Sequence, residues 1–133
     1  MRHLNYFKEH IDVDQYQHGS CEVFALAMHM ELGYDMYFLL DEQAFFEDDG
    51  DGFYGEALVH AYCGNKSGRM FDVTGEIDED YLFKEFEVNE PKIIQVSDID
   101  FQNMVNDKFI AKTDEKELQD CISYIKYNRN KYL

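Results

Sequence analysis

Three residues in the first half of the chain have side chains that together support nucleophilic catalysis. Cys21 follows the stretch HGS, His60 lies within ALVHAYC, and Asp72 lies within RMFDVT. A nucleophilic cysteine needs a base within hydrogen-bond reach, and the base needs a third group that orients it. We therefore expect Cys21 to be the nucleophile, His60 the base and Asp72 the group that orients His60.

The residues around Cys21 predict a buried helix from Ser20 to Leu32. Ser20 suits the N-cap position, and Gly33 suits the left-handed position that ends a helix. Cys21 would then lie in the first turn, close to unpaired backbone N–H groups and the positive end of the helix dipole. Such a position can lower a thiol pKa from about 8.5 to between about 3.5 and 7.5. The sequence therefore favours a thiolate at Cys21.

The stretch GNKSG (Gly64 to Gly68) predicts a β-hairpin turn between the two strands that carry His60 and Asp72. If Gly64 faces Gly68, His60 lies directly opposite Asp72 on the same face of the sheet. Directly opposed Cβ atoms are about 4.5–5.5 Å apart, so the carboxylate could reach an imidazole N–H. We expect a hydrogen bond between these two side chains.

The order of these residues resembles that of the papain-like-fold cysteine enzymes. In those enzymes a cysteine begins a buried helix, a histidine follows on one strand, and an aspartate follows on the next. The stretch VHAYCGNKSGRMFDVTG resembles transglutaminase-like and arylamine acetyltransferase-like members, and the Cys–His order is shared with NlpC-type hydrolases. GSC is similar to the nucleophile segment of papain-type proteases, although no tryptophan follows Cys21 and the chain is much shorter.

The resemblance implies acyl transfer from an amide or thioester to water or to an amine, as in a peptidase, deamidase, isopeptidase or transglutaminase. His60 would act as base and later as acid. The N–H of Cys21, with the Gln15 amide six residues before it, would hold the oxyanion. His18, three residues before Cys21, could replace a missing partner. No cofactor is implied.

The rest of the chain predicts a single α+β domain over residues 1–133, with a papain-like core of a buried helix on a small antiparallel sheet. Asp41 to Glu56 carries seven acids and no base, which favours a long, exposed and irregular loop. The remaining predicted elements are a strand at Met36–Leu40, a helix over DEDYLFKEF (78–86), a strand over KIIQVS (92–97) and a helix in the tail (114–133).

The composition limits the classes of partner. The chain of 133 residues has 12 basic and 28 acidic residues, a formal charge of −16. Such a charge repels nucleic acids and anionic membranes and suits a protein or peptide substrate, or a basic protein partner. No apolar run is long enough to span a membrane, and the first ten residues lack the apolar region of a secretory signal. Three widely spaced cysteines indicate free thiols in a cytoplasmic protein.

The cysteines, the histidines and the acidic loop could also have structural or metal-binding roles. Cys21 could be core filler, as we expect for Cys63 and Cys121. HGSC and HAYC each resemble a zinc-ligand pair, but His60 and Cys63 should point to opposite faces of a strand. The acidic loop fits calcium poorly, because Leu58 stands where an EF-hand needs glutamate.

At the level of function, the alternative is a non-enzymatic acidic binding protein on the same scaffold, such as a phage or mobile-element inhibitor of a host factor.

Overall fold

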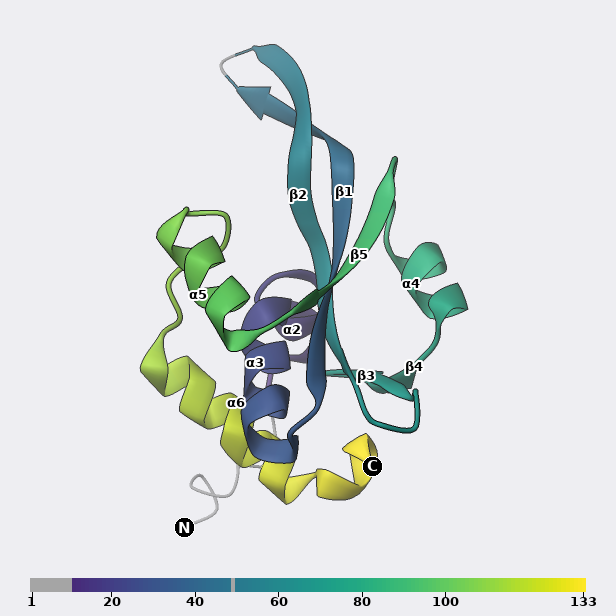
Figure 1. Ribbon diagram of the computed structural model, residues 1–133, viewed down its shortest axis with the longest axis vertical. Helices are drawn as coiled ribbons and strands as arrows, with labels where there is room; N and C mark the ends of the chain where they lie inside the picture. The colour runs from purple at the N-terminus through teal and green to yellow at the C-terminus, as the bar shows by residue number, and fades with distance from the viewer. Residues whose placement is uncertain (1–10, 49) are drawn as a thin grey trace.

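A five-stranded antiparallel sheet lies at the centre of the protein, with strand order β4-β3-β2-β1-β5 (Figure 1). The structure is a computed structural model that describes residues 11–48 and 50–133. Its elements are α2 (Val13–His18), α3 (Cys21–Leu32), β1 (Asp35–Asp48), β2 (Asp51–Gly64), β3 (Met70–Asp72), β4 (Gly75–Ile77), α4 (Glu79–Glu85), β5 (Pro91–Val96), α5 (Asp98–Asn106), α6 (Glu115–Tyr127) and the 3-10 helix η1 (Arg129–Tyr132). This arrangement confirms the α+β class.

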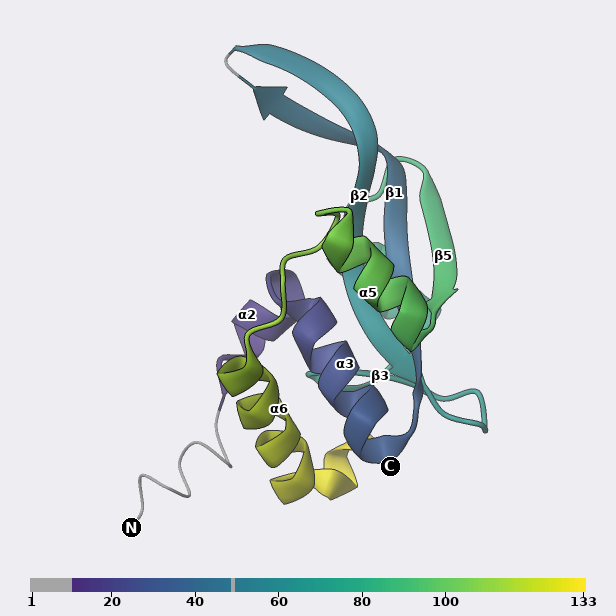
Figure 2. The same ribbon diagram turned by 60° about the vertical axis from the view of Figure 1, so that its left-hand side comes forward.

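The predicted helix after Ser20 is confirmed as α3. Ser20 is the N-cap residue, although its side chain makes no capping hydrogen bond, and Gly33 ends the helix with φ 73°. Helix α3 is apolar around most of its circumference because it lies between the sheet and α6 (Figure 2). Phe24 and Met28 are almost completely buried there. The position of Cys21 at the start of a central helix is therefore fixed by the core.

The two faces of the sheet carry separate apolar clusters. The larger, which we call the core cluster, packs α3 and α6 against one face and includes Phe38, Cys63 and Phe71. The smaller, which we call the outer cluster, includes Leu39 and Phe86 and packs α4 against the other face. Because successive strand residues point to opposite faces, neighbouring residues of β2 belong to different clusters.

The prediction of an irregular loop from Asp41 to Glu56 is wrong. Strands β1 and β2 continue through this segment as a two-stranded ribbon and turn back at Gly50, whose φ is 85°. Phe45 pairs with Tyr54 and Phe46 with Phe53. Aromatic residues favour strands and stabilise each other across a ladder, and their effect outweighs the run of acids. We call residues 41–48 and 51–56 the hairpin arm.

The turn between β2 and β3 is longer than predicted. Gly64 pairs with Met70 rather than with Gly68, so the predicted register is wrong by two residues. The Asn65 side chain sets this loop by accepting hydrogen bonds from the backbone N–H groups of Ser67 and Arg69, both at 3.0 Å. A shift of two residues keeps the same side chains on the same face. His60 and Asp72 are therefore still on the same face of the sheet, where the predicted hydrogen bond between their side chains can form.

The predicted strand at Met36–Leu40 is confirmed as the first part of β1. The other predicted elements are confirmed as α4, β5 and α6, which η1 follows, whereas α2, β4 and α5 were not predicted. Helix α5 begins with a capping box between Ser97 and Asp100. None of the helices in the described part of the chain is long and apolar enough to cross a membrane. The expectation about a secretory signal concerns residues 1–10, which lie outside the described residues.

Candidate functional site

His60 and Asp72 form a buried hydrogen-bonded pair, as predicted. Nε2 of His60 lies 2.8 Å from Oδ2 of Asp72, and the two side chains are 0% and 2% exposed. The pair is not directly opposed, because β2 and β3 pair only at Cys63–Phe71 and Gly64–Met70. In that register Asp72 is diagonal to His60, two positions further along the same face.

Asp72 is held by a second set of donors from the turn that follows it. Its Oδ1 accepts hydrogen bonds from the backbone N–H and the hydroxyl of Thr74. Burial by itself would raise the pKa of Asp72, but the hydrogen bonds from His60 and Thr74 outweigh burial and hold that pKa below its ordinary value. Asp72 is therefore a carboxylate at neutral pH, suited to orient an imidazole.

The ring of His60 is covered by Phe86. The two rings are stacked with their centroids 4.3 Å apart. Nδ1 of His60 is buried and has no hydrogen-bond partner, the one such side-chain nitrogen or oxygen found within residues 11–48 and 50–133. Buried polar atoms are nearly always paired. Because Asp72 holds Nε2, Nδ1 is the ring nitrogen that can still accept a hydrogen bond.

Cys21 is the first residue of α3 and its sulfur is buried. The side chain is 4% exposed, and Sγ accepts a hydrogen bond from the N–H of Ala61 at 3.3 Å. The thiol also lies 3.9 Å from Oε2 of Glu22. Burial, with a further contribution from the Glu22 charge, raises the pKa of Cys21 to about 12. The backbone N–H groups of Cys21, Glu22 and Ala61 lower this pKa, but burial outweighs them, so the thiolate expected at the helix N-terminus is not favoured in this conformation.

The Cys21 sulfur binds β2 next to His60, but no hydrogen bond joins the two side chains. Ala61, which binds the Cys21 sulfur, directly follows His60 in the chain. Cys21 belongs to the core cluster, whereas the His60 ring packs on Phe86 of the outer cluster, and no hydrogen bond joins Cys21 to His60. The fold assembles the His60–Asp72 pair and places the Cys21 sulfur one residue along the strand from it.

Gln15 and His18 bind other partners. Nε2 of Gln15 lies 3.5 Å from Oγ of Ser20 and 3.4 Å from Oε1 of Glu117, so its amide lies beside the residue that precedes Cys21. Nε2 of His18 lies 3.2 Å from Oε1 of Glu85. Neither side chain contacts the Cys21 sulfur through a hydrogen bond.

Helices α2 and α4 meet over the site. Gln17 donates to the hydroxyl of Tyr81 at 2.7 Å, His18 pairs with Glu85, and the His18 and Phe86 rings lie 5.4 Å apart. We call these five residues the α2–α4 cover. Sequence reasoning missed it, because no local signal shows that α2 reaches α4. The role of Thr74 could have been found, since Asp-x-Thr is typical of a side-chain-capped turn.

The other cysteines are core residues, as predicted. The thiol of Cys63 donates to the carbonyl of Ala25 at 3.2 Å, on the sheet face opposite His60, and Cys121 is completely buried. Burial raises the pKa of both thiols above the ordinary value. Within the described residues, no group of three or more His, Cys, Asp or Glu side chains is placed to hold a metal ion.

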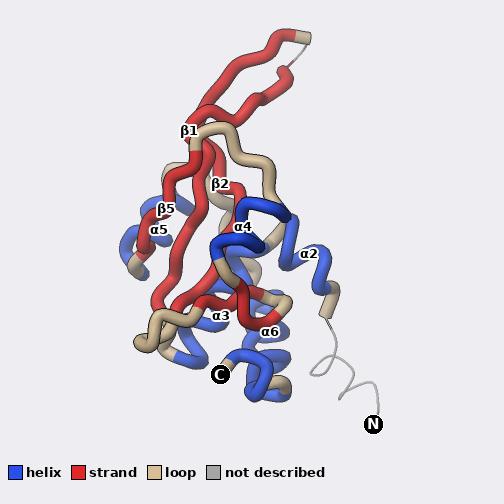
Figure 3. The backbone as a smooth tube through the Cα atoms, turned by 90° about the vertical axis from the view of Figure 1, so that its right-hand side faces the viewer, coloured by secondary structure: helices blue, strands red, loops and turns tan. Residues whose placement is uncertain are grey.

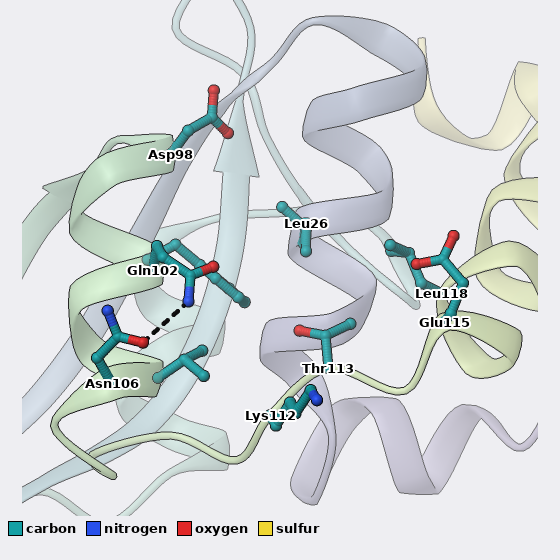
Figure 4. A pocket seen from close by; sticks show the side chains of 10 residues that line it. Leu26, Asp98, Gln102, Asn106, Lys112, Thr113, Glu115 and Leu118 are labelled. Atoms are coloured by element: carbon teal, nitrogen blue, oxygen red, sulfur yellow. Dashed lines mark hydrogen bonds between the residues drawn. The ribbon is translucent and has the colours of Figure 1, made fainter.

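Two surface cavities lie near the N-terminal helices. One, of about 460 Å³, is lined by Glu22, the residue after Cys21, and by Phe46, Glu56, Lys108 and Ile110 among others, whereas Cys21, His60 and Asp72 are not among its lining residues. The other, of about 580 Å³, lies between α3, α5 and the start of α6, and Gln102 and Asn106 are hydrogen-bonded within it (Figure 4).

Comparison with known proteins gives no relative: the chain matches no known protein family, no curated protein sequence and no solved structure. The geometry of the site therefore carries the functional argument.

Proposed function

We propose that this protein is a small thiol-dependent acyl hydrolase or acyltransferase with a papain-like core, in which Cys21, His60 and Asp72 act together. The observation that carries the proposal is the buried His60–Asp72 pair. Its carboxylate binds one ring nitrogen at 2.8 Å, and the other ring nitrogen has no partner. The adjacent backbone N–H already binds the Cys21 sulfur. A thiol that turned toward His60 would supply the missing partner.

The chemistry follows from these roles. Nδ1 of His60 takes the proton of the Cys21 thiol, and the sulfur attacks the carbonyl carbon of an amide or thioester. The imidazolium returns the proton to the leaving amine or thiol, which departs as the C–N or C–S bond breaks and a thioester to Cys21 remains. Water or an amine, deprotonated by His60, then releases the acyl group and restores the thiol. Asp72 stabilises the imidazolium throughout.

The proposal requires an opening step. Cys21 and His60 are buried, and the Cys21 thiol is neutral at pH 7 in this conformation. The α2–α4 cover is held by one hydrogen bond, by the exposed contact between His18 and Glu85 and by the contact between the His18 and Phe86 rings, so its separation costs less than unfolding. Helix α2 leads directly through Gly19 and Ser20 into Cys21, so a movement of α2 uncovers the end of α3.

The cavity beside Glu22 indicates the class of substrate. Two acids, Glu22 and Glu56, and one base, Lys108, line it together with apolar side chains such as Phe46, so its lining carries a net negative charge. A carbonyl substrate with a neutral or cationic group fits this lining better than an anionic one. The three free thiols suit a reducing compartment such as the cytoplasm, which we include in the proposal.

An acyl-donor assay tests the proposal. The protein is mixed with p-nitrophenyl acetate, and acetylation is located by mass spectrometry of peptides. We expect stoichiometric release of p-nitrophenolate with acetylation of Cys21, loss of the burst in Cys21→Ala, and an unchanged burst in Cys63→Ala. Acetylation spread equally over the cysteines, or a full burst in Cys21→Ala, would overturn the proposal.

A second function has support from the burial of the site. Cys21, His60 and Asp72 are 0–4% exposed, and the pKa of the Cys21 thiol is about 12. These properties are also those of residues that only stabilise a protein core. On this alternative the chain is a non-enzymatic acidic binding protein, such as a phage or mobile-element inhibitor of a host factor. Absence of acetylation at Cys21 together with an unimpaired biological effect of Cys21→Ser would favour it.

A further inference from the structure

The hairpin arm projects away from the rest of the protein (Figure 1, Figure 3). Strand β5 pairs with β1 from Met36 to Asp41, and the residues before β5 hold Glu42 and Gln43 through hydrogen bonds with Glu90 and Asn89, so beyond Gln43 the ribbon consists of β1 and β2 alone. Two-stranded hairpins are marginally stable in water without further packing. Phe46 lines a cavity with Phe109 and Ile110, whereas Phe45 and Tyr54 on the other face of the arm are mostly exposed and lack such cover.

The arm exposes aromatic side chains on both faces. Phe45 and Tyr54 are 54% and 64% exposed, and their ring centroids lie 5.3 Å apart. On the opposite face Phe46 and Phe53 are stacked at 5.2 Å. Phe45 lies so close over Gly52 that a Cβ there would collide with its ring. Exposed, contiguous aromatic surface of this kind is typical of protein interaction sites.

The negative charge around these rings limits the kind of partner surface that can bind them. The chain has no lysine or arginine from Asp35 to Asn65, and Glu47 and Asp51 are exposed near the end of the arm, whereas Lys108 lies at its base, where it lines a cavity with Phe46 and Glu56. This charge repels nucleic acid phosphates, anionic lipids and a second copy of the same arm. A partner surface must instead combine an apolar groove with flanking cations.

We propose that the hairpin arm docks onto a partner protein whose apolar groove is flanked by lysine or arginine residues. Phe45 and Tyr54 fill the groove, and the acids at the rim pair with the flanking cations. The docking surface is separate from Cys21, His60 and Asp72, so it operates whether the site is catalytic or structural. Failure of one proposal leaves the other standing.

A defined probe tests the docking surface. A synthetic helical peptide with a leucine stripe flanked by lysines is titrated into the full-length ¹⁵N-labelled protein, and amide shifts are followed by NMR. We expect perturbations confined to the hairpin arm, and affinity weaker by about tenfold or more in the double variant Phe45→Ser/Tyr54→Ser. The variant Phe83→Ser, whose native side chain is 48% exposed on α4, serves as the matched control and should bind normally.

Charge is tested separately. A peptide with glutamate in place of lysine should not bind, and Glu47→Gln/Asp51→Asn should weaken the lysine peptide and reduce the salt dependence of its affinity. The proposal is overturned if the lysine peptide fails to bind, if it binds the aromatic double variant with unchanged affinity, or if it perturbs residues away from the arm. Concentration-dependent dimerisation through the arm would overturn it as well, because the occupant would then be a second copy.

Acetylation of Cys21 by p-nitrophenyl acetate should be the same in all arm variants, which separates this test from that of the proposed function.

Discussion

The candidate site and the hairpin arm depart from ordinary protein structure in opposite ways. At the site, His60 and Asp72 are polar groups buried almost completely, and one nitrogen of His60 has no partner. On the arm, Phe45 and Tyr54 are large rings exposed by more than half. Exposed single aromatics are common, but buried unpaired polar atoms and paired exposed aromatics are not.

The buried pair and the exposed aromatic residues should therefore differ in how much they contribute to the stability of the fold. The buried pair is part of the packed interior, so its removal should damage folding as well as any chemistry. The arm aromatics contribute little to the interior, so they can be removed at low cost to the fold. A variant that loses function without losing stability is therefore easier to obtain on the arm than at the site.

The largest expected effect is the loss of stability in Asp72→Ala. The change leaves the His60 ring and the donors of Thr74 without a partner in a buried setting, which typically costs about 3–5 kcal/mol. Urea denaturation should show this loss in the free energy of unfolding. The control Asp98→Ala removes an aspartate that is 75% exposed and pairs with His29, and it should cost less than about 1 kcal/mol. A cost for Asp72→Ala as small as that of the control would contradict a buried pair.

Stability should also fall in acid because of the same residue. The pKa of Asp72 in the folded protein lies below the value of about 3.9 expected in the unfolded chain. Its contribution is therefore fully present above about pH 4 and is lost as the pH falls through the folded pKa. Unfolding free energies measured from pH 7 to pH 2 should decline less steeply in Asp72→Asn than in the unaltered protein. Equal slopes would show that the pKa of Asp72 is the same in both states.

A smaller effect is expected for opening the α2–α4 cover. Gln17→Ala removes the hydrogen bond to Tyr81, which should cost about 1 kcal/mol and increase the rate of alkylation at Cys21. Gln102→Ala, which removes the hydrogen bond to Asn106 on exposed α5, is the matched control. Alkylation rates measured by mass spectrometry should rise in the first variant and not in the second.

The smallest effect on stability should come from the arm. The double variant Phe45→Ser/Tyr54→Ser is expected to change the free energy of unfolding by less than about 1 kcal/mol, since it removes one exposed cross-strand pair. Phe38→Ser, in the same strand β1 but completely buried, should cost several times more. Thermal or urea unfolding distinguishes these outcomes, and a large loss in the double variant would show that the arm is part of the core.

The sequence predicted the parts of the structure that depend on local signals. Helix α3 was found from its cap positions, and the His60–Asp72 pair from the turn between two strands. The arm was missed because its acids were weighed above its paired aromatics, whose cross-strand contacts are visible only once the register is known. The pKa of Cys21 was misjudged mainly because burial depends on tertiary packing, which the position at a helix N-terminus does not reveal; the smaller contribution of Glu22, the next residue, was visible in the sequence and was not weighed.

The rates at which the three cysteines react with iodoacetamide test the central claim most directly. Cys21, Cys63 and Cys121 are 4%, 0% and 0% exposed, and burial raises the pKa of each, so the closed structure alone predicts slow reaction at all three. If Cys21 becomes a His60-activated nucleophile when the cover opens, it should react about tenfold faster than the other two in the folded protein, and at the same rate in urea. His60→Gln, measured at a temperature at which circular dichroism shows it to be folded, should remove this advantage. Equal rates in the folded protein, or an advantage of Cys21 that persists in His60→Gln, would contradict the account.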